Sequence, residues 1–134
     1  MNKSILAVVF LLLTISSVTA QESLNVDRAV AKNIELSFPN EQNIRPKRSD
    51  FGIVNYVLMS NEQGERWSVV TLKNKALGSR EFEQGDLMAL FADGQRRSPE
   101  TFKLDFKGGE TLSLTVTFGV SKFPVLALYT NSGD

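Results

Sequence analysis

Apolar and polar residues alternate along much of the chain, with the period of two that is typical of half-buried β-strands. The clearest stretch runs from Thr111 to Phe118, where every second residue is large and apolar and each residue between carries a hydroxyl group. Strongly apolar runs predict strands at 51–59, 86–92 and 123–129, and shorter alternating patterns predict them at 34–38, 66–75, 81–83 and 102–106. We expect the 51–59 strand to be buried on both faces or to bend at Gly52.

Turn signals separate these predicted strands at intervals of about 8 to 12 residues. Asp93-Gly94 and Gly108-Gly109 are the strongest, because glycine adopts positive φ angles without a steric cost. No stretch after residue 20 shows a helical period over ten or more residues, and we assign no element to 21–33. We therefore predict an all-β fold, an antiparallel immunoglobulin-like β-sandwich of about seven or eight strands.

The first 20 residues have the three parts of a secretory signal peptide. Lys3 supplies the positive charge, the run from Ile5 to Ile15 is apolar, and small residues lead to Ala20. This apolar run is too short to span a bilayer, which needs about 20 residues. We expect cleavage after Ala20, export to the periplasm or the exterior, and a mature chain (21–134) that forms one domain without a membrane span.

Composition excludes several kinds of chemistry. The chain has no cysteine and no histidine, so it forms no disulfide and cannot build a Ser-His-Asp or Cys-His catalytic arrangement. The same absence argues against a dedicated zinc or copper site, and we expect no cofactor. Fifteen basic residues balance 15 acidic ones. This balance argues against nucleic acid as the partner, because phosphate binding needs a surplus of positive charge.

Three short stretches resemble one kind of known domain. They are a strand that runs into asparagine (Val69–Asn74), a hairpin with Asp-Gly (Leu90–Gly94) and a Gly-Gly-Glu step before a long alternating strand (Gly108–Leu112). Over residues 64–129 this arrangement resembles small exported bacterial immunoglobulin-like domains of uncharacterised function. The resemblance implies the sandwich fold and brings no catalytic residue with it.

Two basic groups are candidate contacts for a partner. Arg45, Lys47 and Arg48 lie in a polar loop, where they could contact an acidic glycan or an anionic lipid head group. Arg96 and Arg97 follow a tight turn, and neighbouring strand residues point to opposite faces, so the two do not easily serve one pocket. The alternatives are a solvated loop for the first group and a charged strand edge that discourages strand addition for the second.

Other side chains have a functional and a purely structural interpretation. Glu81, Glu83 and Asp86 could hold Ca²⁺ or act as acid and base in a small hydrolase; the alternative is an acidic strand edge. Trp67 could stack on a sugar ring, although we interpret it as a core residue. The hydroxyl row from Thr111 to Thr117 could be a flat binding face or the solvent side of a strand.

These observations favour a function that does not involve catalysis. We expect an exported interaction or accessory module of the bacterial envelope, which binds a protein partner or an envelope glycan by surface or strand-edge complementarity. The alternative is a carbohydrate-binding module, which needs several exposed aromatic residues on one face. One Trp and two Tyr residues in the whole chain are few for that purpose.

Overall fold

The computed structural model describes residues 23–30, 36–39 and 44–133. In these residues the chain forms strands and one short 3-10 turn, and no helix is long and apolar enough to cross a bilayer. In chain order the elements are β1 (Asn25–Val26), β2 (Phe51–Ser60), β3 (Glu65–Asn74), β4 (Arg80–Glu83), η1 (Gln84–Asp86), β5 (Met88–Phe91), β6 (Arg96–Arg97), β7 (Lys103–Phe106), β8 (Thr111–Val120) and β9 (Val125–Tyr129). The prediction of an all-β fold is confirmed.

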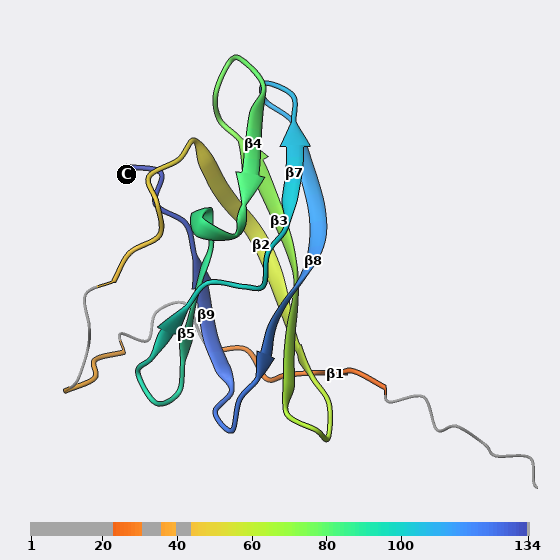
Figure 1. Cartoon of the computed structure of the whole chain (residues 1–134), viewed down its shortest axis with the longest axis vertical. Coiled ribbons are helices and arrows are strands. Elements are labelled where there is room, and N and C mark those ends of the chain that lie inside the picture. Colours follow the sequence, from red (N-terminus) through yellow and green to blue (C-terminus); the bar gives the residue numbers. More distant parts are fainter. Residues whose placement is uncertain (1–22, 31–35, 40–43, 134) are drawn as a thin grey trace, which may run out of the picture.

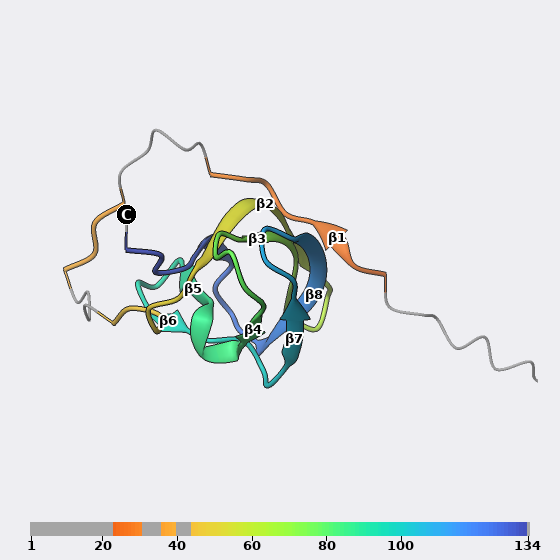
Figure 2. The same cartoon turned by 90° about the horizontal axis from the view of Figure 1, so that it is seen from above.

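The strands form three antiparallel sheets (Figure 1). The largest has the order β1-β2-β3-β8, and its three long strands each contain ten residues. β4 pairs with β7, and β5 lies between β6 and β9. The turn η1 lies between β4 and β5 in the chain, and these two strands belong to different small sheets. Figure 2 shows the two small sheets lying together on one side of β2, β3 and β8.

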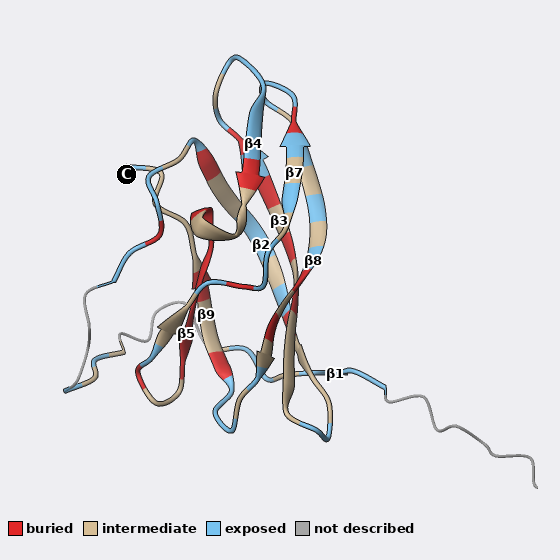
Figure 3. Cartoon of the chain, in the orientation of Figure 1, coloured by how far each residue is buried: buried red, intermediate tan, exposed pale blue. Residues whose placement is uncertain are grey.

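The core lies between the large sheet and the two small ones (Figure 3). Phe51 of β2 packs edge-on against Phe82 of β4 and Phe106 of β7, with ring centroids 4.7 Å and 5.0 Å apart. Phe91 of β5 meets Phe118 of β8 in the same manner at 6.3 Å. Such edge-to-face pairs stabilise a core beyond the burial of their area. Each small sheet therefore contacts the large sheet through phenylalanine rings.

Alternation along β3 and β8 determines which residues reach this core. On β3, Ser68, Val70 and Leu72 are buried. The hydroxyl residues from Thr111 to Thr117 lie on the opposite, outer face, as the structural interpretation of that row expects. Trp67 also belongs to the outer face and is half-buried, so its interpretation as a core residue is wrong. Residues of β3 point to alternate sides, and the even-numbered ones face the core.

Several predicted strands differ in detail from the structure. β2 is present as predicted. Its exposed valines show that it is not buried on both faces. The irregularity in its pairing lies between Ile53 and Asn55 instead of at Gly52. Of the strand predicted at 34–38, the described residues 36–38 are not in a strand. The predicted signal peptide lies outside the described residues.

Candidate functional site

One side of β2 is an open sheet edge over much of its length. β3 pairs with β2 from Phe51 to Ser60, whereas on the other side β1 pairs only with Met59 and Ser60. Within the described residues no further strand pairs with that side. The edge from Ile53 to Val57 is therefore open, and its peptide groups can pair with an added strand.

The direction of the peptide groups along this edge follows from one hydrogen bond. The carbonyl of Leu58 accepts a hydrogen bond from the backbone N–H of Asp27, with 2.8 Å between the nitrogen and the oxygen. Alternate residues of an antiparallel strand direct their peptide groups to the same side, so those of Tyr56 also point to the open edge. A β-bulge at Val54 then interrupts the pairing with β3 and turns the strand locally.

A groove with a volume of about 440 Å³ lies beside the open edge. It is lined by β2, by the segment 23–30 and by Leu126 of β9. Two of the large apolar residues that line it, Val54 and Val57, are 52% and 43% exposed. An open edge beside exposed valines suits an extended apolar segment, because the backbone can pair while alternate side chains enter the groove.

The segment 23–30 crosses β2 near its end (Figure 1). Residues of this segment also line the groove. The carboxylate of Asp27 accepts a hydrogen bond from the hydroxyl of Ser60, in addition to the backbone bond of Asp27. Val26 pairs with Met59, but its side chain is 72% exposed. The segment is therefore attached mainly by polar contacts and buries little apolar area.

These contacts hold the segment 23–30 only weakly. A hydrogen bond in a protein contributes about 1 kcal/mol of net stability, whereas fixing the backbone of one residue costs about 1–2 kcal/mol. The two residue pairs between β1 and β2 and the hydrogen bonds of Asp27 have to offset the conformational entropy that the whole segment loses when it becomes ordered. Little apolar burial adds to them, so the segment can leave the edge at a small cost in free energy.

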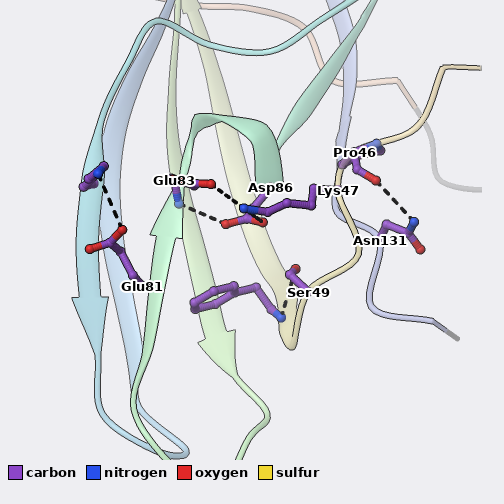
Figure 4. Close-up of polar contacts among 9 residues, drawn as sticks. Pro46, Lys47, Ser49, Glu81, Glu83, Asp86 and Asn131 are labelled. Atoms are coloured by element: carbon purple, nitrogen blue, oxygen red, sulfur yellow. Dashed lines mark hydrogen bonds and ion pairs between the residues drawn. The ribbon is translucent and has the colours of Figure 1, made fainter.

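The chain immediately before β2 is held much more firmly. Residues 44–50, which we call the strap, run past η1 before they enter β2 (Figure 4). The backbone N–H of Lys47 donates to the carbonyl of Gly85 at 2.9 Å. The ammonium group of Lys47 donates to Glu83, and it lies 3.6 Å from the carboxylate of Asp86. Backbone and side chain of one residue thus attach the strap to η1.

The charges of this cluster depend on one another. Asp86 is only 2% exposed, and one of its oxygens accepts a hydrogen bond from the backbone N–H of Glu83 at 3.0 Å. A buried carboxylate is costly unless it is paired, and Lys47 supplies the opposite charge. The hydrogen bond from Lys47 lowers the pKa of Glu83 below its usual value of 4.5. The same bond raises the pKa of Lys47 above 10.5.

Asn131, close to the C-terminus, holds the strap from its other side (Figure 4). Its side-chain amide donates to the carbonyl of the buried Pro46 at 3.2 Å. Its carbonyl accepts from the backbone N–H of Ser49 at 2.9 Å, and Arg48 forms a single bridge with it. The strap is therefore clamped between η1 and the end of the chain.

The predicted partner contacts of the strap differ in their surroundings. Lys47 forms ion pairs with Glu83 and Asp86, and these pairs give its side chain a structural role that needs no partner molecule. Arg45 and Arg48 are exposed. All three side chains are exposed, but only that of Lys47 also forms ion pairs with η1.

The two arginines of β6 lie over aromatic rings. The guanidinium of Arg97 is 4.1 Å from the ring centroid of Phe91, and that of Arg96 is 5.4 Å from the ring centroid of Tyr129. Arg96 also donates to the carbonyl of Ile44 at 3.1 Å. Cation–π contacts of this kind stabilise a fold. These residues therefore cover the edge of the three-stranded sheet, and the partner contacts predicted for them stay a prediction.

The three acidic residues singled out in the sequence do not form one group. Glu81 lies 3.9 Å from the ammonium group of Lys103, whereas Glu83 and Asp86 pair with Lys47. Among the described residues no set of three acidic side chains is arranged to hold a metal ion. Each carboxylate is paired with a lysine. The interpretation as an acidic strand edge fits Glu81 and Glu83, which lie on β4, and is wrong for Asp86, which is buried in η1.

The outer face of the large sheet carries one indole ring. Trp67 lies directly opposite Met59 on β2 and Thr117 on β8. Its ring N–H donates to Glu65 at 3.4 Å. The rest of this face on β8 consists of hydroxyl side chains, and a single tryptophan among them is a small platform for a sugar ring.

Comparison of the chain with protein-family models, curated proteins and solved structures gives no match. The assignment of a function therefore rests on the open edge of β2, the groove beside it and the segment that partly covers it.

Sequence patterns did not reveal this edge. Val54 and Val57 stand in an apolar run that the sequence alone indicates as core, and the exposure of both depends on the bulge. Asp27 lies in 21–33, where the sequence pattern predicts no element. The spacing of Leu24 and Val26 before this acidic residue is the only signal that could have indicated a short strand.

Proposed function

We propose that this chain is an exported, non-enzymatic interaction module of the bacterial envelope, with an immunoglobulin-like sandwich as its fold. Its binding site is the open edge of β2 from Ile53 to Val57, and its partner contributes an extended apolar segment. The observation that carries this proposal is the open edge itself, which lies beside an apolar groove and exposes two valines.

Strand addition explains how such a module recognises its partner. The peptide groups of Tyr56 pair with the added strand, which supplies affinity independently of the partner's sequence. Val54 and Val57 select for apolar side chains at alternate positions of the partner, because side chains of a strand alternate between two faces. Arg45 and Arg48 are the proposed basic contacts that remain available to an anionic group of the same partner or of an envelope glycan.

A carbohydrate-binding module is the second candidate, and the outward position of Trp67 favours it. The hydroxyl row of β8 lies next to the indole ring and offers hydrogen bonds to a sugar. Quenching of the tryptophan fluorescence by envelope polysaccharide, and loss of retention on that polysaccharide in Trp67→Ala, would support this candidate against strand addition.

The test of the proposed function is site-specific photo-crosslinking in the source cells. A photoreactive residue at Val57 should give a discrete protein adduct, because this side chain lies beside the open edge. The matched control is the same residue at Lys73, which is exposed on the outer face of β3, a strand that is paired on both sides. The Val57 adduct should disappear when Val54→Lys is added, since a charge in the groove opposes an apolar segment. Equal labelling at Val57 and Lys73 would contradict the proposal.

A further inference from the structure

We propose that β2 binds, at Leu58, Met59 and Ser60, the segment 23–30 of a second copy of this chain, in place of its own. This inference goes beyond the proposed function, because these contacts adjoin the open edge from Ile53 to Val57 and do not occupy it. The same polar contacts that join the segment to β2 within one molecule would then join two molecules. Exchange of an identical element between copies leaves the interactions unchanged.

The segment and the edge match at defined atoms. Val26 lies opposite Met59, the backbone N–H of Asp27 donates to Leu58, and the Asp27 carboxylate accepts from Ser60. None of these contacts depends on which copy of the chain supplies the segment. The second copy is therefore a partner whose complementarity to β2 the structure already displays.

The segment can leave without loss of the core. In the part of the chain that the structure describes, no residue of the hydrophobic core precedes Phe51. The strap, residues 44–50, is clamped separately by Lys47 and Asn131, so release of the segment does not loosen the start of β2. The clamp thus divides the chain into a firmly packed part and an end that can be exchanged.

The connection between these two parts is long enough for exchange. Thirteen residues, 31–43, separate Val30 from Ile44. A fully extended chain spans at most about 3.6 Å per residue, so this connection bridges up to about 45 Å. This reach exceeds what a neighbouring copy of a small domain requires.

A mixed disulfide experiment tests the proposal, and the absence of cysteine from the native chain makes it specific. Val26→Cys and Met59→Cys are made in separate chains of different size, which span the expected mature residues 21–134. Opposite residues of a strand pair lie close enough for a disulfide. When the two variants are mixed and mildly oxidised, the adduct between them should form only if the segment of one molecule reaches β2 of the other.

The matched control replaces Met59→Cys by Thr115→Cys, which places the thiol on β8, away from the segment. We expect at least tenfold more mixed adduct with Met59→Cys than with this control. Equal amounts of adduct would overturn the inference. The double variant Val26→Cys/Met59→Cys checks the geometry: it should oxidise readily, and failure to form any disulfide would also overturn the inference, since the pairing would then be wrong.

The outcomes separate this inference from the proposed function. A specific Val57 adduct with a different protein, combined with no excess of mixed disulfide, supports strand addition and overturns self-association. A Val57 adduct that contains a second copy, together with the mixed disulfide, supports both. Mixed disulfide in purified protein without any Val57 adduct in cells supports exchange of the segment and contradicts the envelope interaction.

Discussion

A few single residues hold neighbouring loops together at one end of the molecule. Asn74 is fully buried, and its side-chain amide donates to the carbonyls of Gly78 and Lys107 at 3.0 Å and 3.1 Å. These bonds join the β3–β4 loop to the β7–β8 turn at the upper end of Figure 1. Gly108 permits the close approach, since a Cβ atom there would lie 2.0 Å from the carbonyl oxygen of Leu77.

At this scale we expect Gly108→Ala to destabilise the domain strongly. The added methyl group collides with backbone, which cannot move aside as a flexible side chain could, and overpacking of this kind costs about 1–3 kcal/mol. Gly85→Ala is the matched control, because nothing lies within 4 Å of a Cβ atom at that position. In urea unfolding, the midpoint concentration of Gly108→Ala should be lower than that of the native chain, whereas that of Gly85→Ala should not. Equal midpoints for the two variants would contradict the close contact.

Individual elements differ in how firmly they are attached. β2, β3 and β8 are long and pair over nearly their whole lengths, whereas β1 has two residues. The strap is not a strand, yet a buried carboxylate, an ion pair and an asparagine hold it. The strength of attachment therefore follows the number of satisfied polar groups and the buried area, not the assignment of an element as a strand.

For the strap we predict a stabilisation that depends on pH. The pKa of Glu83 is lowered in the folded protein, so its contribution is present above about pH 4.5 and is lost as the pH falls through the folded value. The pKa of Lys47 is raised, so its contribution is present below about pH 10.5 and is lost as the pH rises through the folded value. The melting temperature of Glu83→Gln should thus fall below that of the native chain at neutral pH, and the two should converge in acid.

The control for this prediction is Glu81→Gln on the same strand. It removes a longer ion pair, 3.9 Å from Lys103, and exposed pairs of this kind contribute little. Thermal melts between pH 3 and 10 should therefore show a larger effect for Glu83→Gln than for Glu81→Gln. If the melting temperatures of Glu83→Gln and the native chain differed by the same amount down to pH 3, the ion pair would not be the cause of the difference.

Among the described residues, the hydrophobic core begins at Phe51, and residues 23–30, 36–39 and 44–50 lie outside it. The core unites the large sheet with both small sheets, which share no ladder with each other among the described residues. The strap contacts η1 and Asn131, so it joins the region between the small sheets to the end of the chain. Among the described residues, the segment 23–30 pairs with β2 and lines the groove beside it.

At this scale we predict that a chain beginning at Ile44 folds nearly as stably as a chain beginning at Gln21. Among the described residues, removal of 21–43 takes away the weak contacts of the segment 23–30 and the half-buried Leu36 and Phe38. The melting temperature should change by less than about 4 °C, which corresponds to about 1 kcal/mol. A chain beginning at Phe51 also loses the strap and leaves Asp86 without its lysine. It should melt at least about 8 °C lower, and equal melting of the two truncated chains would contradict the role of the clamp.

Sequence patterns identified most strands of the core and little of the candidate site. The alternation along β8 depends on local geometry, in which neighbouring side chains point to opposite faces, and it therefore appears directly in the order of the residues. The open edge depends on which strands are neighbours. Val54 and Val57 read as core residues because an apolar run contains no information about a missing neighbour or a bulge.

Residue types and local periodicity are enough to predict the β class and the turns, and to exclude disulfides and histidine- or cysteine-dependent catalysis. The clamp around Lys47, the outward position of Trp67 and the open edge of β2 become visible in the folded chain. Each of these depends on contacts between residues far apart in the chain. Such contacts arise from the packing of whole sheets, which the pattern within one strand does not specify.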